Sequence, residues 1–449
     1  MRLTMGQGIN GARNAMKAIL CAWLSLAVLC AAAGGDDRTY RVEADRSDGL
    51  YKCGETATFT VTVLSTNNIQ RATECLAVRL DNFGTNELSS VVFNLAVTNV
   101  FRISGTLQEP GFLRVSLPAT KQRGKDPSDF SVGFEPEKIR KGSSSPKDFD
   151  EFWANAIRIL DKTVPADPQL VLLPELSKGK FNYWRISFAS YGGTRACGFL
   201  SMPKDASSEK KYPVRVQVPA AGHGWWTNHM IGSDDAICML MSVHPFDPPF
   251  DQDENVKMQG AVMDGLKERY GIRNYAVAGI AASREDYYFY RAILGINRAV
   301  NWLAAREEVD LSRFTYSGTS QGGGFGFYLL GLNRHFTKGA LFVPAITDTM
   351  GYMAGRQSGW PKIVESQKEE DRKAAERNAP YFDGANFASR IACPVRVAVG
   401  FSDIVCAPCA VYAAYNEIRS ADKAILNGIG MTHDCRKEFY RTLGDWQRR

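Results

Sequence analysis

Residues 314–330 have the sequence FTYSGTSQGGGFGFYLL, which places Ser320 in a G-x-S-x-G pentapeptide. A strand-like run precedes the serine, and a glycine-rich run of helical character follows it. This order is typical of a nucleophile elbow, in which Gly318 and Gly322 permit a turn tight enough to hold the serine in a strained conformation above a sheet. The stretch therefore predicts an α/β fold with Ser320 as nucleophile. A chance Gly/Ser loop is the alternative.

A base is needed next, because a serine hydroxyl at its ordinary pKa is a poor nucleophile. Folds with this elbow supply their residues in the order Ser, Asp or Glu, His. Only His335 and His433 follow Ser320. His335 lies at the far end of the helix that starts at the elbow, roughly 20 Å away at about 1.5 Å per residue. We therefore expect His433 to be the base, in a flexible loop after the last strand.

The orienting acid should end a strand between the serine and the histidine. Asp403 directly follows the apolar run 395–402, and a carboxylate there would hold the imidazole in the required tautomer. Asp348 is the rival, because it also follows a strand-like run, 340–343. We favour Asp403.

An oxyanion hole requires two donors aimed at the reacting carbonyl. The backbone N–H of Gln321 is the first candidate, and Ala221, in the loop after the strand-like run 214–218, is the second. Trp225 and Trp226 lie nearby and could form a stacking wall for a sugar ring. Simple packing of the two tryptophans is the alternative.

Strand-like and helical runs alternate from residue 148 to residue 449, which predicts a mostly parallel sheet covered by helices, the α/β-hydrolase fold. One expected helix begins at residues 148–153, and another spans residues 288–305. The charged, helix-prone segment 356–377 is expected to be an exposed insertion, either a lid or a solvated helix. The expected strands are 214–218, 275–280, 314–317, 340–343, 395–399 and 424–426.

Residues 36–132 differ from the rest, because short runs with a period of two, such as 57–63, 91–97 and 112–117, are separated by Gly, Asn and Pro. This pattern predicts an N-terminal β-sandwich of the immunoglobulin-like (Ig-like) type. The polar stretch 133–147 is the expected linker. The sandwich is either a structural spacer or a glycan-binding module, and the spacer is favoured.

The first 35 residues combine Arg2, Arg13 and Lys17 with a short apolar run that ends in small residues. This is typical of a secretory signal peptide, and a membrane anchor is the alternative, although the run is shorter than the roughly 20 residues that span a bilayer. We expect a secreted or periplasmic protein without stable membrane insertion. The net charge of +6 gives no case for nucleic acid binding.

Eight cysteines follow the signal segment, in a compartment that permits disulfides. Cys53 and Cys75 could join two strands of the sandwich, with unpaired burial as the alternative. Cys406 or Cys409 could bond Cys435 and brace the loops of Asp403 and His433, with free buried thiols as the alternative. The Cys-x-x-Cys pair at 406–409 fits neither a redox motif nor a zinc site well, because no second pair has matching spacing.

Several longer stretches resemble the acetyl xylan esterase and cephalosporin-C deacetylase family, carbohydrate esterase family 7, from about residue 146 onward. The matching stretches are 148–153 (DFDEFW), 193–204 (GTRACGFLSMPK), 288–291 (YFYR), 298–300 (RAV), 309–310 (VD), 318–323 (GTSQGG), 400–406 (GFSDIVC), 413–416 (AAYN) and 432–433 (TH).

The resemblance implies deacetylation of acetylated xylo-oligosaccharides and other small acetyl esters, without metal or cofactor, and we expect an acetylated oligo- or polysaccharide as substrate. It aligns Ser320, Asp403 and His433 with the catalytic triad and Gln321 with one oxyanion donor. Where the family has a loop resembling His-Gly-Tyr, this chain has Pro-Ala-Ala at 219–221, which keeps a backbone donor and changes the side chains beside the acyl pocket. The N-terminal module is also additional to the hexameric family enzymes, so a homo-oligomer is left open.

Two rival functions share parts of this pattern. A different esterase, or a peptidase of the same fold, would keep the triad and change the pocket. A non-catalytic glycan-binding protein would bind polysaccharide without releasing acetate.

Overall fold

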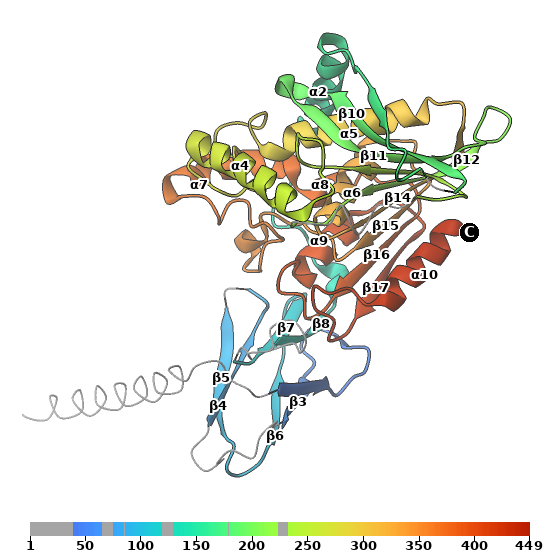
Figure 1. Ribbon diagram of the computed structural model, residues 1–449. Helices are drawn as coiled ribbons and strands as arrows, with labels where there is room; N and C mark the ends of the chain where they lie inside the picture. The colour runs from blue at the N-terminus through green and yellow to red at the C-terminus, as the bar shows by residue number, and fades with distance from the viewer. Residues whose placement is uncertain (1–38, 65–74, 85, 119–128, 178, 223–231) are drawn as a thin grey trace, which may run out of the picture.

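The computed structural model describes residues 39–64, 75–84, 86–118, 129–177, 179–222 and 232–449 (Figure 1). The expected signal peptide, residues 1–35, lies outside these ranges. Within them, no helix is both long and apolar enough to cross a membrane.

A mixed sheet of nine strands forms the centre of the C-terminal part, in the order β17-β16-β15-β14-β12-β13-β11-β10-β9. The strands from β17 to β13 run parallel to one another, and β11, β10 and β9 continue the sheet antiparallel. The expected α/β architecture is therefore confirmed. The strands are β9 Gln169–Leu172, β10 Phe181–Ala189, β11 Arg195–Pro203, β12 Tyr212–Val218, β13 Ile237–Met241, β14 Val309–Thr319, β15 Lys338–Phe342, β16 Val395–Gly400 and β17 Lys423–Gly428.

Helices cover both faces of this sheet because alternate residues of each strand point to opposite sides (Figure 1). Ala340 and Ala398 pack with Leu443 of α10 on one face. Leu341 and Val397 belong to the large cluster that includes α6 on the other face. The helices are α2 Phe149–Thr163, α4 Gln252–Tyr270, α5 Tyr288–Ala304, α6 Gln321–Leu332, α7 Arg372–Asn378, α8 Gly384–Ala388, α9 Pro408–Glu417 and α10 Lys437–Arg448.

One expected strand is wrong. Residues 275–280 form buried turns rather than a strand, and Gly279 within them has φ +83°. The carbonyl of Ala278 accepts a hydrogen bond from the N–H of Tyr288, the first residue of α5. This apolar run is buried, and it leads into helix α5. A continuous apolar run without polar alternation does not distinguish such a buried turn from a buried strand.

Segment 356–377 is also not simply an exposed insertion. Its first half is largely buried, with Ser358 and Ile363 fully covered. Helix is confined to its second half, in the short 3-10 helix Glu369–Asp371 and in all but the last residue of α7. The charged residues that suggested exposure are concentrated in this second half. The charge content of the whole segment therefore did not reveal that its first half is apolar.

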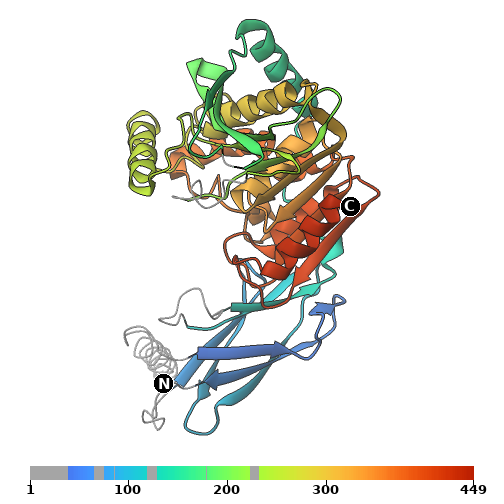
Figure 2. The same ribbon diagram turned by 45° about the vertical axis from the view of Figure 1, so that its right-hand side comes forward.

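Residues 39–134 form a separate pair of sheets, called here the N-terminal unit (Figure 2). One sheet has the order β1-β3-β6 and the other β2-β8-β7-β4-β5. Side chains from both, among them Val61 and Val115, share one hydrophobic cluster. The strands are β1 Thr39–Ala44, β2 Leu50–Tyr51, β3 Ala57–Leu64, β4 Cys75–Asp81, β5 Glu87–Asn94, β6 Val100–Gly105, β7 Gly111–Ser116 and β8 Asp129–Phe134.

The stretch after the N-terminal unit is held against the C-terminal part by hydrogen bonds. Lys141 Nζ donates to Asn386 Oδ1 at 2.9 Å, and the N–H of Gly142 donates to the carboxylate of Asp348. Asp348 is fully buried and also forms an ion pair with Arg356 at 3.0 Å, while Arg356 donates to the carbonyl of Arg140. One buried ion pair thus joins the connecting stretch to the loop after β15.

Removing the cation of this pair should strongly destabilise the protein. We expect Arg356→Met to lower the free energy of unfolding by about 3–5 kcal/mol at neutral pH, because Asp348 is left as a buried unpaired charge. The loss should shrink toward pH 5, since burial raises the pKa of Asp348 and its protonated form then folds at lower cost. Urea unfolding at the two pH values measures both effects.

The matched control is Arg313→Met, which breaks an ion pair with Asp310 at the surface. Arg313 is 59% exposed, so this change should cost less than about 1 kcal/mol. Equal losses for the two variants would contradict the importance of the buried pair.

Candidate active site

Ser320 lies at the sharp turn between β14 and α6, with φ 54° and ψ −117°. Its N–H donates to the carbonyl of Phe342, and its own carbonyl accepts from the N–H groups of Gly324 and Ala345, each at 2.9 Å. These bonds hold a positive φ that a side-chain-bearing residue adopts only under constraint. The elbow expected from the sequence is formed, and the serine is 6% exposed.

The glycines of the pentapeptide are required by close backbone approach. A Cβ on Gly322 would lie 2.0 Å from the carbonyl oxygen of Val218, and a Cβ on Gly318 would lie 2.4 Å from the carbonyl oxygen of Gly322. The elbow therefore packs directly against the end of β12, where a methyl group has no space.

His433 is the histidine that reaches the serine. Its Nε2 lies 3.0 Å from Ser320 Oγ, although the two residues are 113 positions apart. The imidazole comes from the loop between β17 and α10 and is 31% exposed. His335 stays near Phe314 in the first half of β14, with 6.2 Å between ring centroids. The structure therefore places His433, and not His335, beside Ser320.

Asp403, rather than Asp348, is the acid that contacts His433. Its Oδ2 lies 2.8 Å from His433 Nδ1, and its Oδ1 accepts the N–H groups of Val405 and Cys406, each at 2.8 Å. The carboxylate is fully buried, so these bonds leave it one orientation. Asp348 is instead committed to Arg356 and Gly142.

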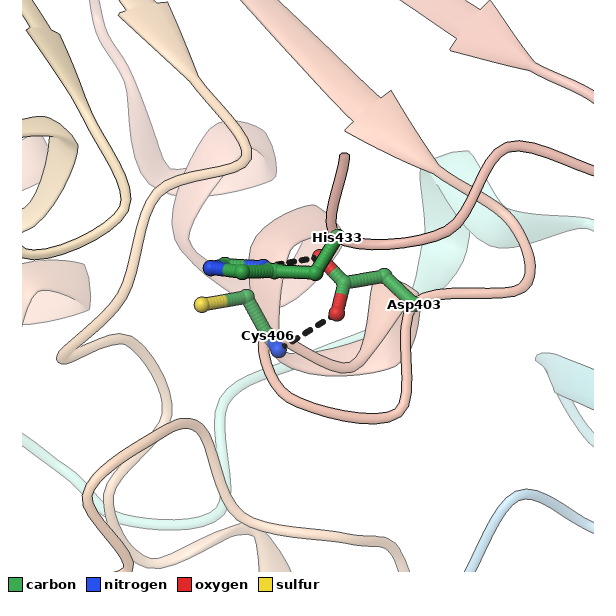
Figure 3. A group of neighbouring side chains, drawn as sticks. All are labelled: Asp403, Cys406 and His433. Carbon is green, nitrogen blue, oxygen red and sulfur yellow. Dashed lines mark hydrogen bonds and ion pairs between the residues drawn. The ribbon is translucent and has the colours of Figure 1, made fainter. Parts of the chain in front are cut away.

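Cys406 is a neighbour of the acid and the base that the sequence argument did not assign to the site (Figure 3). Its Sγ, an oxygen of Asp403 and a nitrogen of His433 all lie within 4.8 Å of one another, a grouping that could hold a metal ion. Oδ1 of Asp403 accepts two backbone N–H groups and Oδ2 contacts His433 Nδ1, so a metal would compete with these hydrogen bonds. Burial raises the pKa of the Cys406 thiol well above its ordinary value, which keeps it protonated and neutral.

The proposed oxyanion donors lie on neighbouring segments. Gln321 is the first residue of α6. Its side-chain oxygen accepts from the hydroxyl of Tyr275 at 2.8 Å, and its Nε2 lies 3.4 Å from the carbonyl oxygen of Pro219. Ala221 follows Pro219 by two residues. Trp225 and Trp226 lie outside the described residues.

Tyr275 supports the elbow, and sequence reasoning missed it. It lies in the run that was predicted to be a strand, and no motif marks it. Burial raises its pKa, so the phenol keeps the proton that it donates to Gln321.

The expected disulfides are not formed. All eight cysteines of the described ranges are free thiols. Cys406 and Cys409 are buried, and Cys409 Sγ contacts the carbonyl of Gln357 at 3.6 Å. The alternative of free buried thiols therefore holds for Cys406, Cys409 and Cys435.

An elbow serine, a histidine and a buried aspartate meet at the carboxyl ends of parallel strands, in the chain order Ser, Asp, His. This arrangement defines a member of the α/β-hydrolase class. The family model described as acetyl xylan esterase (AXE1) matches residues 135–443. The chain therefore belongs to the acetyl xylan esterase family and is a carboxylic ester hydrolase.

Individual relatives agree with this family. The acetyl esterase Axe7A of Xylanibacter ruminicola is 26% identical over 391 residues, which cover 86% of this chain and 84% of that protein. The acetyl xylan esterase of Paenibacillus sp. R4 is 22% identical with a TM-score of 0.59, and acetyl xylan esterase 1 of a Thermoanaerobacterium species is 19% identical with a TM-score of 0.55. These two cover 70% of this chain and 98% and 96% of their own lengths, and they share its fold.

A methyl group on the elbow should destroy the site. We expect Gly322→Ala to displace the Ser320 turn from β12 and to lower kcat by at least about 10²-fold, because a shift of roughly 1 Å in a reacting group has that effect. Esterase turnover with p-nitrophenyl acetate measures it. Gly265→Ala is the control, since Gly265 lies in α4 with nothing within 4 Å of its added methyl group. Similar turnover in both variants would contradict the packing argument.

Proposed function

We propose that this esterase is an exported enzyme that removes acetyl groups from acetylated xylan or xylo-oligosaccharides through a Ser-His-Asp acyl-enzyme mechanism. One observation carries the proposal, namely the continuous hydrogen-bonded series from Ser320 Oγ through His433 to the buried carboxylate of Asp403. No residue assigned to this mechanism requires a metal or a cofactor.

The first step forms the acetyl-enzyme. Ser320 Oγ attacks the acetyl carbonyl carbon while His433 Nε2 takes the hydroxyl proton, which leaves an imidazolium opposite Asp403. The tetrahedral intermediate collapses, the bond between the carbonyl carbon and the sugar oxygen breaks, and His433 returns the proton to the departing sugar alcohol. Water then attacks the acetyl-serine by the same route and releases acetate.

The developing negative charge needs donors beside Ser320. The backbone N–H of Gln321 is suited to this, because it belongs to the residue directly after the nucleophile and to the first turn of α6, where backbone N–H groups are unsatisfied by the helix. The side-chain amide of Gln321 donates to the carbonyl of Pro219, two residues before Ala221, so the loop of Ala221 lies beside the first turn of α6. This proximity supports the backbone N–H of Ala221 as the second donor. Fixed donors of this kind need no rearrangement as the charge forms.

Asp403 has two roles in this scheme. Accepting the Nδ1 proton of His433 leaves Nε2 free to act as base, and the negative charge stabilises the imidazolium. Two backbone N–H groups supply the other hydrogen bonds that a buried carboxylate requires. The neutral thiol of Cys406 adds no competing charge beside them.

The organisation of the chain is part of the proposal. We infer a signal peptide at 1–35, an Ig-like β-sandwich at 36–132, a connecting stretch at 133–147 and the esterase domain at 148–449. Two sheets that share one hydrophobic cluster support the sandwich. Family membership and the similarity to Axe7A support an acetylated glycan as substrate.

Changes at the triad test the mechanism. We expect Ser320→Ala to lower kcat by about 10⁶-fold and Asp403→Asn by about 10⁴-fold, with little change in KM, because the nucleophile or the tautomer of its base is lost. Acetate release from acetylated xylan and from p-nitrophenyl acetate measures both. Ser312→Ala, at an exposed position of β14, is the control and should keep full turnover. Undiminished turnover in Ser320→Ala would refute the mechanism.

A substrate panel tests the specificity. We expect kcat/KM to fall by at least about tenfold from p-nitrophenyl acetate to the butyrate, since each extra methylene in a closed pocket costs roughly 1–3 kcal/mol. Preference for longer acyl chains or for peptides would support another α/β-hydrolase activity. Binding of acetylated xylan without acetate release would support the non-catalytic alternative.

A further inference from the structure

The N-terminal unit touches the segment that carries Asp403, defined here as the acid loop, residues 401–406. Ser131 on β8 is fully buried, and its hydroxyl donates a hydrogen bond to the carbonyl of Phe401. The ring of Phe112 on β7 meets the ring of Phe401 edge to face, with 5.0 Å between centroids. These contacts fix the first residue of the acid loop, two positions before the carboxylate.

A second connection reaches the far side of Asp403. The carbonyl of Phe83 in the N-terminal unit accepts the N–H of Gln357 at 3.0 Å. The side-chain amide of Gln357 donates to the carbonyl of Ile404 at 2.7 Å. The acid loop is therefore held on both sides of its carboxylate by bonds that lead back to the N-terminal unit.

The same unit also contacts the base loop, residues 429–433. Ile429 packs against the hydrophobic clusters of both parts of the molecule. Gly430 has φ +65°, and a Cβ there would lie 3.3 Å from the ring of Phe130. The two loops are also bonded to each other, because the N–H of Ser402 donates to the carbonyl of Met431 at 2.9 Å.

From this geometry we propose that Ser131 and Phe112 are positioning residues of the esterase, through which the N-terminal unit sets the alignment of Asp403 with His433. The proposal rests on the triad proposed above. It assigns the N-terminal unit a part in turnover, in addition to any role as a spacer or a glycan-binding module.

The two positioning residues lie outside the part of the chain that matches the family model. Two solved relatives match almost their whole length to 70% of this chain, and the family match begins at residue 135. The alignment to Axe7A covers 86% of this chain, more than lies after residue 134, so it includes part of the N-terminal unit. Support of the acid loop by Ser131 and Phe112 therefore uses a segment outside the family match.

The size of the effect follows from how sharply acid–base catalysis depends on geometry. Without the Ser131 hydroxyl, the buried carbonyl of Phe401 loses its donor, and the loop must shift to find another partner. A displacement of roughly 1 Å in catalytic groups costs up to about 10²-fold in rate. We expect a smaller displacement here and a loss of about tenfold.

The experiment compares three variants of the full-length protein. Ser131→Ala removes one hydrogen bond, and Phe112→Leu reduces the ring contact with Phe401. Leu113→Ala is the matched control, because Leu113 is the next residue on β7, is also fully buried, and packs into the separate cluster of the N-terminal unit. Phe112→Leu and Leu113→Ala remove the same number of carbon atoms.

Three quantities are measured well below the melting temperature of each variant. The first is the melting temperature, the second is the steady-state turnover of p-nitrophenyl acetate, from which kcat and KM are both obtained, and the third is the low-field proton resonance of His433 Nδ1–H by NMR on protein with isotope-labelled histidine. The resonance reports the hydrogen bond to Asp403 directly. A role limited to folding would change the melting temperature alone.

We expect Ser131→Ala and Phe112→Leu to lower kcat by about tenfold with KM within about twofold, and to move the His433 resonance upfield. Leu113→Ala should lower the melting temperature while kcat and the resonance stay at wild-type values. The proposal is overturned if Ser131→Ala and Phe112→Leu keep wild-type kcat and resonance, or if Leu113→Ala changes both as much as they do.

Ser131→Ala removes only one hydroxyl group, so this variant alone decides the test if Phe112→Leu fails to fold. A failure of the triad itself is recognised separately, because Ser320→Ala would then retain its turnover whatever the N-terminal variants do.

Discussion

The imidazole of His433 is hydrogen-bonded at both nitrogens, to a serine 113 positions earlier and to an aspartate 30 positions earlier. These two hydrogen bonds require three loops from distant parts of the chain, those of Ser320, Asp403 and His433, to lie within hydrogen-bond distance of one another. The sheet order β14-β15-β16-β17 makes that possible, because parallel strands end at the same edge. Ser320 follows β14, Asp403 follows β16 and His433 follows β17. The close packing of the elbow glycines and the bonds among the loops serve this one alignment.

Two buried aspartates show how their surroundings assign different roles to the same side chain. Asp403 accepts hydrogen bonds from its own loop and faces the imidazole of His433, which takes up and releases a proton in the proposed mechanism. Asp348 faces the permanent cation Arg356 and ties together segments distant in sequence. Both are fully buried, and each carries the partners that a buried carboxyl group requires. The first arrangement supports proton transfer, and the second supports the architecture.

The parts of the site that were predictable from the sequence were those with a local signature. The elbow has its motif, and His433 followed from chain order and from the distance that excludes His335. Position after a strand alone did not separate Asp403 from Asp348, and the family resemblance of residues 400–406 favoured Asp403. The partner that commits Asp348 to another role, Arg356, is a tertiary contact without a sequence signal. Residues 275–280 were misassigned for a related reason, since burial alone does not specify a strand. The contact of Ser131 with Phe401 joins positions 270 apart and has no sequence signal.

The N-terminal unit emerges first during synthesis, whereas the loops that it meets belong to the last part of the chain. The ring of Phe112 packs against the rings of Phe401 and Tyr412, so these contacts cannot form until residues beyond 400 have been made. Nascent chains would thus present the face of Phe112 that meets these two rings to chaperones. Hydrolytic competence would then appear only at the last stage of maturation, so that release of acetate reports a completely assembled polypeptide.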